Sequence, residues 1–149
     1  MIKANKLMID DIVEYLGEWW KVIEIYSAIR RDSSTLFNNR EFVTISRYGV
    51  SRSVLVSDLK PIDVTKDLML YKLKFKEELD NFLEEPEYFL GLNNCNLRIN
   101  RYSNKAEKDW SVHIDNIAFS TIGCGDFQYL HELQQLVRII GDEELSIEI

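Results

Sequence analysis

The chain has 149 residues, 46% of them hydrophobic and 29% charged, with a formal net charge of −7. This composition is typical of a globular protein and excludes a disordered tail, while the negative charge disfavours non-specific binding to nucleic acid and to anionic membranes. Two cysteines without a Cys-x-x-Cys pair, the lack of a signal peptide and the lack of any run of roughly 20 apolar residues predict a cytoplasmic protein without a membrane segment.

Residues 1–60 read as short strands separated by turns. The alternation of apolar residues predicts four strands, at 11–16, 19–26, 40–47 and 51–56. On the second of them, simple alternation predicts Trp20, Val22 and Glu24 on one face, and Trp19, Lys21, Ile23 and Ile25 on the opposite face. So many short strands predict an SH3-like small β-barrel or bent sheet over 1–62, which Pro61 helps to end.

The second half combines strands with helices. Thr65 is the expected N-cap of a helix that runs to about Phe75 and links the two halves. Strand signals return at 88–92, 95–102, 110–114 and 117–122, of which the first three are expected to form an antiparallel meander. Asp126 is expected to cap the clearest helix, at 127–140, because apolar residues recur there at helical spacing.

These elements predict an α+β fold: an N-terminal SH3-like small β-barrel or bent sheet, a linking helix, and a C-terminal antiparallel sheet packed on one long helix. The expected units are 1–62 and 63–149, packed as one compact body. Their charges differ, since residues 1–60 hold nine Lys/Arg and eight Asp/Glu, a net +1, whereas 61–149 hold nine and seventeen, a net −8. An anionic partner would therefore have to meet the first unit.

Three short segments, in the same order along the chain, resemble those of a known protein family. The opening 3–13 is similar to an "ANEL-x-IGN-x-V" start, 59–75 to a "PIPLT…WLLKFGF" segment, and 129–136 to a "YVHQLQNL" helix. All three are found in uncharacterised proteins common in Bacteroides genomes and their phages. Asp10-Asp11 stands where these proteins have Ile-Gly or Gly-Asn. The resemblance implies a phage, prophage or mobile-element origin and no catalytic residues.

The sequence offers few groups for catalysis or metal binding. His131-Glu132 lacks the second histidine of a zincin motif, because Gln135 stands four residues after His131. A strand would place His113 and Asp115 on one face, where the carboxylate can orient the imidazole as a general base. A small enzyme built on these groups, with Cys124 as a further member, stays open as an alternative. No nucleophile is visibly paired with a base, so we expect no catalytic residue, metal or cofactor.

Basic and aromatic residues gather near the loops of the first unit. The basic ones are Arg30, Arg31, Arg40, Arg47 and Arg52, and the aromatic ones among them are Trp19, Phe37 and Tyr48. Arginines that hold phosphates beside aromatics that stack bases are typical of a nucleic-acid-binding groove. The net charge of −7 favours the simpler interpretation, in which these arginines pair with nearby carboxylates.

The leading hypothesis is a non-enzymatic accessory protein that acts as an interaction module and binds a protein partner. The expected contact residues are Trp19, Trp20 and Tyr48, because large aromatic side chains supply much of the binding energy at protein interfaces. The nucleic-acid-associated module is the second hypothesis and the small enzyme the third.

Overall fold

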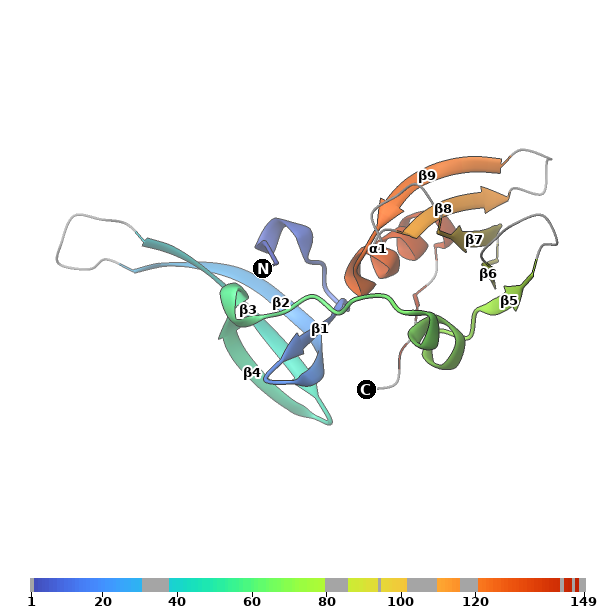
Figure 1. Cartoon of the computed structure of the whole chain (residues 1–149). Helices are drawn as coiled ribbons and strands as arrows, with labels where there is room; N and C mark the ends of the chain where they lie inside the picture. Colours follow the sequence, from blue (N-terminus) through green and yellow to red (C-terminus); the bar gives the residue numbers. More distant parts are fainter. Residues whose placement is uncertain are drawn as a thin grey trace. The chain divides into compact units, whose positions relative to one another are not determined.

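The computed structural model describes residues 2–30, 38–79, 86–93, 95–101, 110–115, 121–142, 144–145 and 147. The chain divides after Ile62 into two compact units, and each unit contains one antiparallel sheet (Figure 1). With the long helix near the C-terminus, this confirms the predicted α+β class. Within the described ranges, no helix combines the length and the apolar character that are needed to cross a bilayer.

The first unit is a four-stranded antiparallel sheet in the order β1-β2-β3-β4. Its strands are β1 (Ile12–Tyr15), β2 (Glu18–Arg30), β3 (Asn38–Arg47) and β4 (Val50–Leu55), with 3-10 turns η1 (Ala4–Lys6) before them and η2 (Val56–Asp58) after them. Beyond η2 the chain returns to β1, where Glu14 N donates to Lys60 O at 3.0 Å and Lys60 N donates to Glu14 O at 2.9 Å. This is a single bridge, so among the described residues the sheet is open and the SH3-like barrel is not confirmed.

A β-bulge in β2 decides which side chains enter the core of the first unit. Val22 pairs with Ile45 and Glu24 with Thr44, so Ile23 is an extra residue on β2. The alternation of faces therefore shifts by one residue after Val22. Ile25 packs against the core instead of lying with Ile23 on the outer face, which corrects the expectation from simple alternation.

The second unit is a five-stranded antiparallel sheet in the order β5-β6-β7-β8-β9, accompanied by helix α1. The bounds are β5 (Lys76–Glu78), β6 (Glu87–Gly91), β7 (Asn96–Asn100), β8 (Trp110–Asp115), β9 (Thr121–Phe127) and α1 (Leu130–Gly141). Helix α1 is amphipathic: Leu130, Leu133 and Val137 are fully buried, whereas Ile139 is 74% exposed. The end of α1 lies close to the segment after β6, since a Cβ added to Gly141 would be 2.9 Å from Leu92 Cδ1.

Helix α1 begins three residues later than its expected start at residue 127. Phe127 still belongs to β9, where it pairs with Trp110, and Tyr129 is the N-cap in place of Asp126. The Glu132 carboxylate accepts hydrogen bonds from the backbone N–H groups of Gln128 at 3.0 Å and Tyr129 at 3.1 Å. An acidic side chain that reaches back in this way satisfies donors that the helix leaves free.

The linking helix is much shorter than expected. Thr65 does cap it, since Thr65 Oγ1 accepts the Leu68 N–H at 3.2 Å, but the regular part is the π-helical turn η3 (Leu68–Lys72). Lys74 then takes a left-handed conformation, with φ of 60°, and Phe75 N donates to Met69 O at 3.0 Å. This seven-to-one bond spans one residue more than the six-to-one bond of a Schellman motif, in keeping with the π-helical turn that it closes. The turn buries Leu68 and Met69 without a full helical stripe.

Candidate interaction surface

The tips of two hairpins lie at the same end of the first sheet. The β1–β2 connection is Leu16-Gly17 and the β3–β4 connection is Tyr48-Gly49. In an antiparallel sheet of order β1-β2-β3-β4, these connections are at one end, and the β2–β3 connection is at the other. A salt bridge of 2.5 Å between Arg47 and Glu18 joins the two hairpins beside their tips. We call this end the hairpin-tip surface, which consists of Leu16, Glu18, Trp19, Arg47, Tyr48 and Val50.

Both tips hold a bulky apolar residue in a conformation that such residues rarely adopt. Leu16 has φ of 53° and Gly17 of 81°, and Tyr48 has φ of 48° and Gly49 of 78°. Positive φ at both central residues is typical of type I′ turns, where asparagine, aspartate or glycine is usual in the first position. For a bulky residue, the left-handed conformation costs about 1 kcal/mol or more. Leu16 and Tyr48 therefore carry backbone strain.

Neither of these side chains is buried to offset that strain. Leu16 and Tyr48 are each 77% exposed, and Val50 beside the second tip is 53% exposed. Exposed apolar groups that gather at one place are typical of surfaces that bind another molecule. At each tip, a bulky side chain therefore has a strained backbone and is also exposed to water. Packing within the first unit explains neither feature.

The charged pair at the tips holds Tyr48 in place. The Arg47 guanidinium carbon lies 4.8 Å from the centre of the Tyr48 ring, within the range of a cation–π contact. The hydrogen bond to Glu18 is the main reason that the pKa of Arg47 is raised, so this side chain stays charged at all ordinary pH values. Because Glu18 balances its charge, the hairpin-tip surface is apolar with a neutral ion pair.

The three expected partner-binding residues have different environments. Tyr48 is exposed, Trp19 is partly buried on β2, and Trp20 is only 5% exposed. The Trp20 ring lies in the core of the first unit, where it meets Tyr15 edge-on at 6.2 Å. Trp20 is therefore a structural residue, which corrects its assignment to a partner-binding surface. Leu16 and Val50 were not predicted, although the Leu-Gly and Tyr-Gly pairs in the turns were visible in the sequence.

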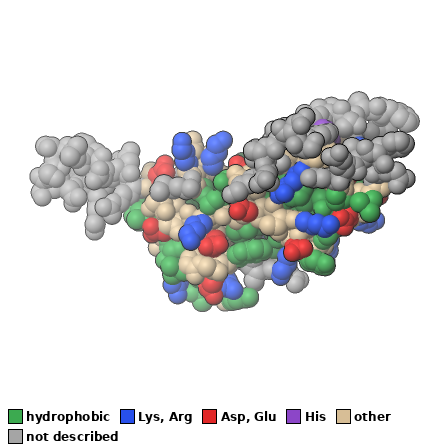
Figure 2. Space-filling view, viewed as in Figure 1, with side chains coloured by type: hydrophobic (Ala, Val, Ile, Leu, Met, Phe, Trp, Pro, Cys, Tyr) green, Lys and Arg blue, Asp and Glu red, His purple; other side chains and the backbone are tan. Residues whose placement is uncertain are grey.

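Among the arginines proposed for nucleic acid, Arg47 and Arg52 are the two whose side chains the structure describes. Arg47 is paired with Glu18, and the exposed Arg52 on β4 has its guanidinium carbon 5.5 Å from the centre of the Trp20 ring. Arg30 lies at the end of β2 and Arg40 near the start of β3, while Arg31 lies outside the described residues, as do Asp32 and Phe37. In Figure 2, basic side chains in blue alternate with acidic ones in red over the described part of the visible face.

The groups of the enzyme hypothesis are spread over three elements. His131 is buried on α1, its ring stacked on Tyr129 at 5.8 Å, and His113 lies on β8 opposite Gly123 of β9. Asp115 ends β8 and Cys124 lies on β9, with side chains outside the described part of the structure. Among the side chains that are described, no three His, Cys, Asp or Glu gather as metal ligands.

Burial of His131 makes the stability of the second unit depend on pH. Burial lowers the pKa of His131 from its ordinary value of 6.5, and Glu132 opposes this shift. As pH falls below 6.5, the unfolded chain binds the proton before the folded chain does, so the free energy of unfolding decreases. This contribution to the free energy of unfolding is fully present above pH 6.5. It is lost by at most about 1.4 kcal/mol per pH unit as the pH falls from 6.5 through the lower pKa of folded His131.

Urea unfolding at several pH values, from about 7.5 to about 5.5, measures this effect. His131→Gln should flatten the dependence, and His113→Gln is the matched control that should retain it. An unchanged slope in His131→Gln would show that other groups cause the pH dependence.

Comparison of the chain with protein-family models, curated proteins and solved structures finds no match. The function must therefore be inferred from the chain's own residues. Among the described residues of the first unit, the hairpin-tip surface is the place where exposure and backbone strain coincide.

Proposed function

We propose that this chain is a non-enzymatic protein-binding module whose first unit contacts its partner through the hairpin-tip surface. The observation that carries this proposal is the pair of bulky apolar residues, Leu16 and Tyr48, each 77% exposed in a left-handed turn at the same end of the sheet. A partner that covers both side chains would remove their apolar area from water. The loss of conformational entropy on binding would be small, because the turns are already formed. Aromatic residues such as Tyr48 are frequent hot spots of such interfaces.

The charge of this surface favours a protein over a nucleic acid. Nucleic-acid binding requires several uncompensated cations that can neutralise phosphates. On the hairpin-tip surface, Arg47 is compensated by Glu18, and none of the other residues of this surface is a cation. An apolar centre with a polar pair beside it is the usual composition of a protein–protein interface.

We further propose that the protein is an accessory protein of a phage or mobile element. The support is the resemblance of three of its segments to Bacteroides phage-type proteins. One structural detail agrees with the Gly-Asn correspondence, in which Asp10 takes the place of glycine: Asp10 has φ of 75°, and glycine is the residue that adopts positive φ most readily. A chain with glycine there would make the same turn before β1.

Site-specific photocrosslinking tests the protein-binding proposal. The photoreactive residue p-benzoylphenylalanine replaces Tyr48 in one variant and Tyr71 in another. Tyr71 is the matched control, because it is also a tyrosine and both side chains are 77% exposed. Each full-length variant is irradiated in a Bacteroides lysate, with and without nuclease. We expect a discrete protein adduct from position 48 that survives nuclease, and none of the same size from position 71.

The other outcomes separate the competing functions. Adducts of equal size and yield from both positions would mean that the hairpin-tip surface has no special role. An adduct that nuclease abolishes would overturn the protein-binding proposal in favour of the nucleic-acid module, with Arg52 and the arginines near the β2–β3 connection as the next residues to test.

Relieving the strain at the first tip is expected to stabilise the protein and weaken partner binding. Leu16→Asn places the residue preferred in a type I′ turn at φ of 53° and should raise the free energy of unfolding by about 0.5–1 kcal/mol. The same change in the position-48 crosslinking variant should lower the adduct yield. Urea unfolding and the crosslinking assay measure the two effects on one protein, and a loss of stability together with unchanged adduct yield would contradict this prediction.

A further inference from the structure

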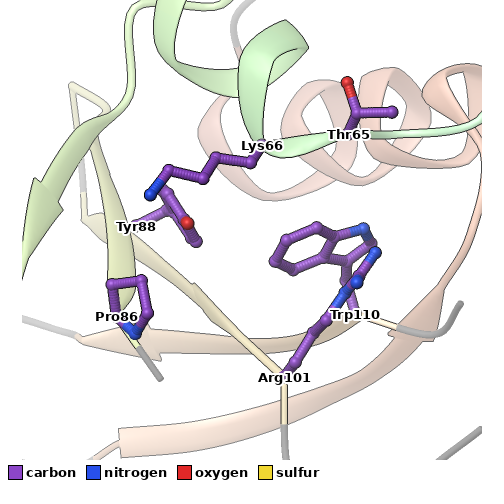
Figure 3. Close-up of a pocket in the computed structure, with 6 residues that line it drawn as sticks. All are labelled: Thr65, Lys66, Pro86, Tyr88, Arg101 and Trp110. Carbon is purple, nitrogen blue, oxygen red and sulfur yellow. The ribbon is translucent and has the colours of Figure 1, made fainter. Parts of the chain in front are cut away.

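The second unit contains a pocket of about 390 Å³, large enough for a small organic molecule. Its lining residues come from the segment before η3, from the start of β6, from the end of β7 and from the start of β8: Thr65, Lys66, Pro86, Tyr88, Arg101 and Trp110. Figure 3 shows the aromatic and cationic side chains around this space. None of the six lining residues is acidic.

Two buried aromatic rings form a rigid part of the pocket wall. Trp110 and Tyr88 are each only 3% exposed and meet edge-on, with 5.7 Å between ring centres. Trp110 Nε1 donates a hydrogen bond of 2.9 Å to Val64 O, which fixes the orientation of the indole. A wall built from fixed rings is already formed before a ligand arrives, and flat apolar surfaces favour a flat apolar ligand body.

The Arg101 guanidinium lies along another part of the wall, and one of its N–H groups has no hydrogen-bond acceptor in the described part of the chain. The Arg101 guanidinium carbon is 4.0 Å from the centre of the Trp110 ring, so the cation is held against the indole. Its Nε is buried, and no acceptor among the described residues reaches it. A buried N–H without an acceptor is unfavourable, and a ligand oxygen would relieve this cost if the guanidinium turned toward the pocket.

A second cation lies on the opposite side. Figure 3 shows Lys66 extending over Tyr88 on the side of Pro86, while Arg101 follows Trp110 on the other side. Lys66 Nζ is 2.5 Å from the Glu77 carboxylate, and this contact raises the pKa of Lys66, so it stays charged. Glu77 does not line the pocket. Because Glu77 balances the charge of Lys66, the cation that remains for a ligand is Arg101, although residues 61–149 carry a net charge of −8.

We propose that this pocket binds a small planar organic anion, in which a carboxylate or phosphate group is received by Arg101 and an aromatic body lies against the rings of Trp110 and Tyr88. Arginine is suited to this task because its planar fork of N–H donors matches the oxygens of a carboxylate or a phosphate. The site belongs to the second unit and does not depend on the hairpin-tip surface of the first. The protein would then have a small-molecule site in addition to its proposed partner-binding surface.

Nuclear magnetic resonance of the full-length protein tests this site through the indole N–H of Trp110, assigned with Trp110→Phe. The probes are benzoate, adenosine 5′-monophosphate, adenosine and inorganic phosphate. We expect benzoate or the monophosphate to shift the Trp110 signal saturably, with adenosine and inorganic phosphate binding more weakly by about tenfold or more. The responding probe tells a carboxylate from a phosphate ligand.

Variants of two arginines supply the control. Arg101→Met should weaken binding of the responding probe by about tenfold or more, with partial recovery in Arg101→Lys, which keeps the charge. Arg52→Met is the matched control, because Arg52 also lies over a tryptophan ring, but in the first unit. The proposal is overturned if no probe shifts the signal saturably, if adenosine binds as tightly as the monophosphate with no response to benzoate, or if Arg52→Met has the same effect as Arg101→Met.

Discussion

Trp20→Ala is expected to lower the free energy of unfolding of the first unit by about 3–5 kcal/mol. The Trp20 side chain is 5% exposed, packs edge-on against Tyr15 and lies beneath the Arg52 guanidinium. Its removal leaves a cavity that small shifts of neighbouring side chains cannot refill. Hydrogen exchange of the β2 and β3 amides in the full chain measures the loss within this unit.

Trp20→Phe and Tyr48→Ala are the controls for this prediction. Among the described residues, Trp20 Nε1 has no hydrogen-bond partner, so phenylalanine loses volume but removes an unsatisfied donor and should cost less than alanine. Tyr48→Ala should change stability by less than about 1 kcal/mol, because the side chain is exposed. If Tyr48→Ala destabilises the first unit as much as Trp20→Ala, the assignment of Trp20 to the core and of Tyr48 to the exposed surface is wrong.

Leu133→Ala is expected to cost about 3–5 kcal/mol in the second unit. Leu133 is fully buried at the centre of the apolar face of α1, between Leu130 and Val137. Ile139→Ala on the same helix is the matched control and should cost less than about 0.5 kcal/mol, since Ile139 is 74% exposed. Hydrogen exchange of the α1 and β8 amides compares the two variants, and equal losses would contradict the burial pattern of this helix.

Periodicity predicted most strands and the long helix because their core faces repeat over several residues. The expected strand at 40–47 corresponds to β3 and that at 110–114 to β8, each within two residues at either end. The bulge at Ile23 was not predictable, because it depends on which residue of β3 pairs with β2, and a sequence pattern does not reveal a pairing register. The buried position of Ile25 follows from that register.

Helix boundaries were harder to predict because capping depends on tertiary contacts. Asp126 is a good N-cap residue, but β9 pairs with β8 through Phe127, and the sheet takes precedence over the local preference. Residues 68–75 are apolar at six of eight positions, and such a run does not distinguish a full helix from a single turn. Lys74 ends that turn in a left-handed conformation for which its residue type gives no signal.

The candidate sites were predicted only in part, because residue type does not determine exposure. Trp19 and Trp20 are neighbours on one strand, and only the packing of the sheet distinguishes the core ring from the partly exposed one. Tyr48 was proposed because it is aromatic and lies in a turn, and it is exposed there. The pocket residues Lys66, Arg101 and Trp110 are far apart in the sequence, so their proximity depends on strand pairing.

The bridge between Glu14 and Lys60 has a consequence for the order in which the protein folds during its synthesis. Every strand pairing of the first sheet, including this bridge at the edge of β1, lies within residues made before the second unit begins at Asp63. Domains generally fold as units, with the N-terminal one first as the chain emerges. The hairpin-tip surface can therefore form, and become available to the proposed partner, on a nascent chain whose second half is still being translated.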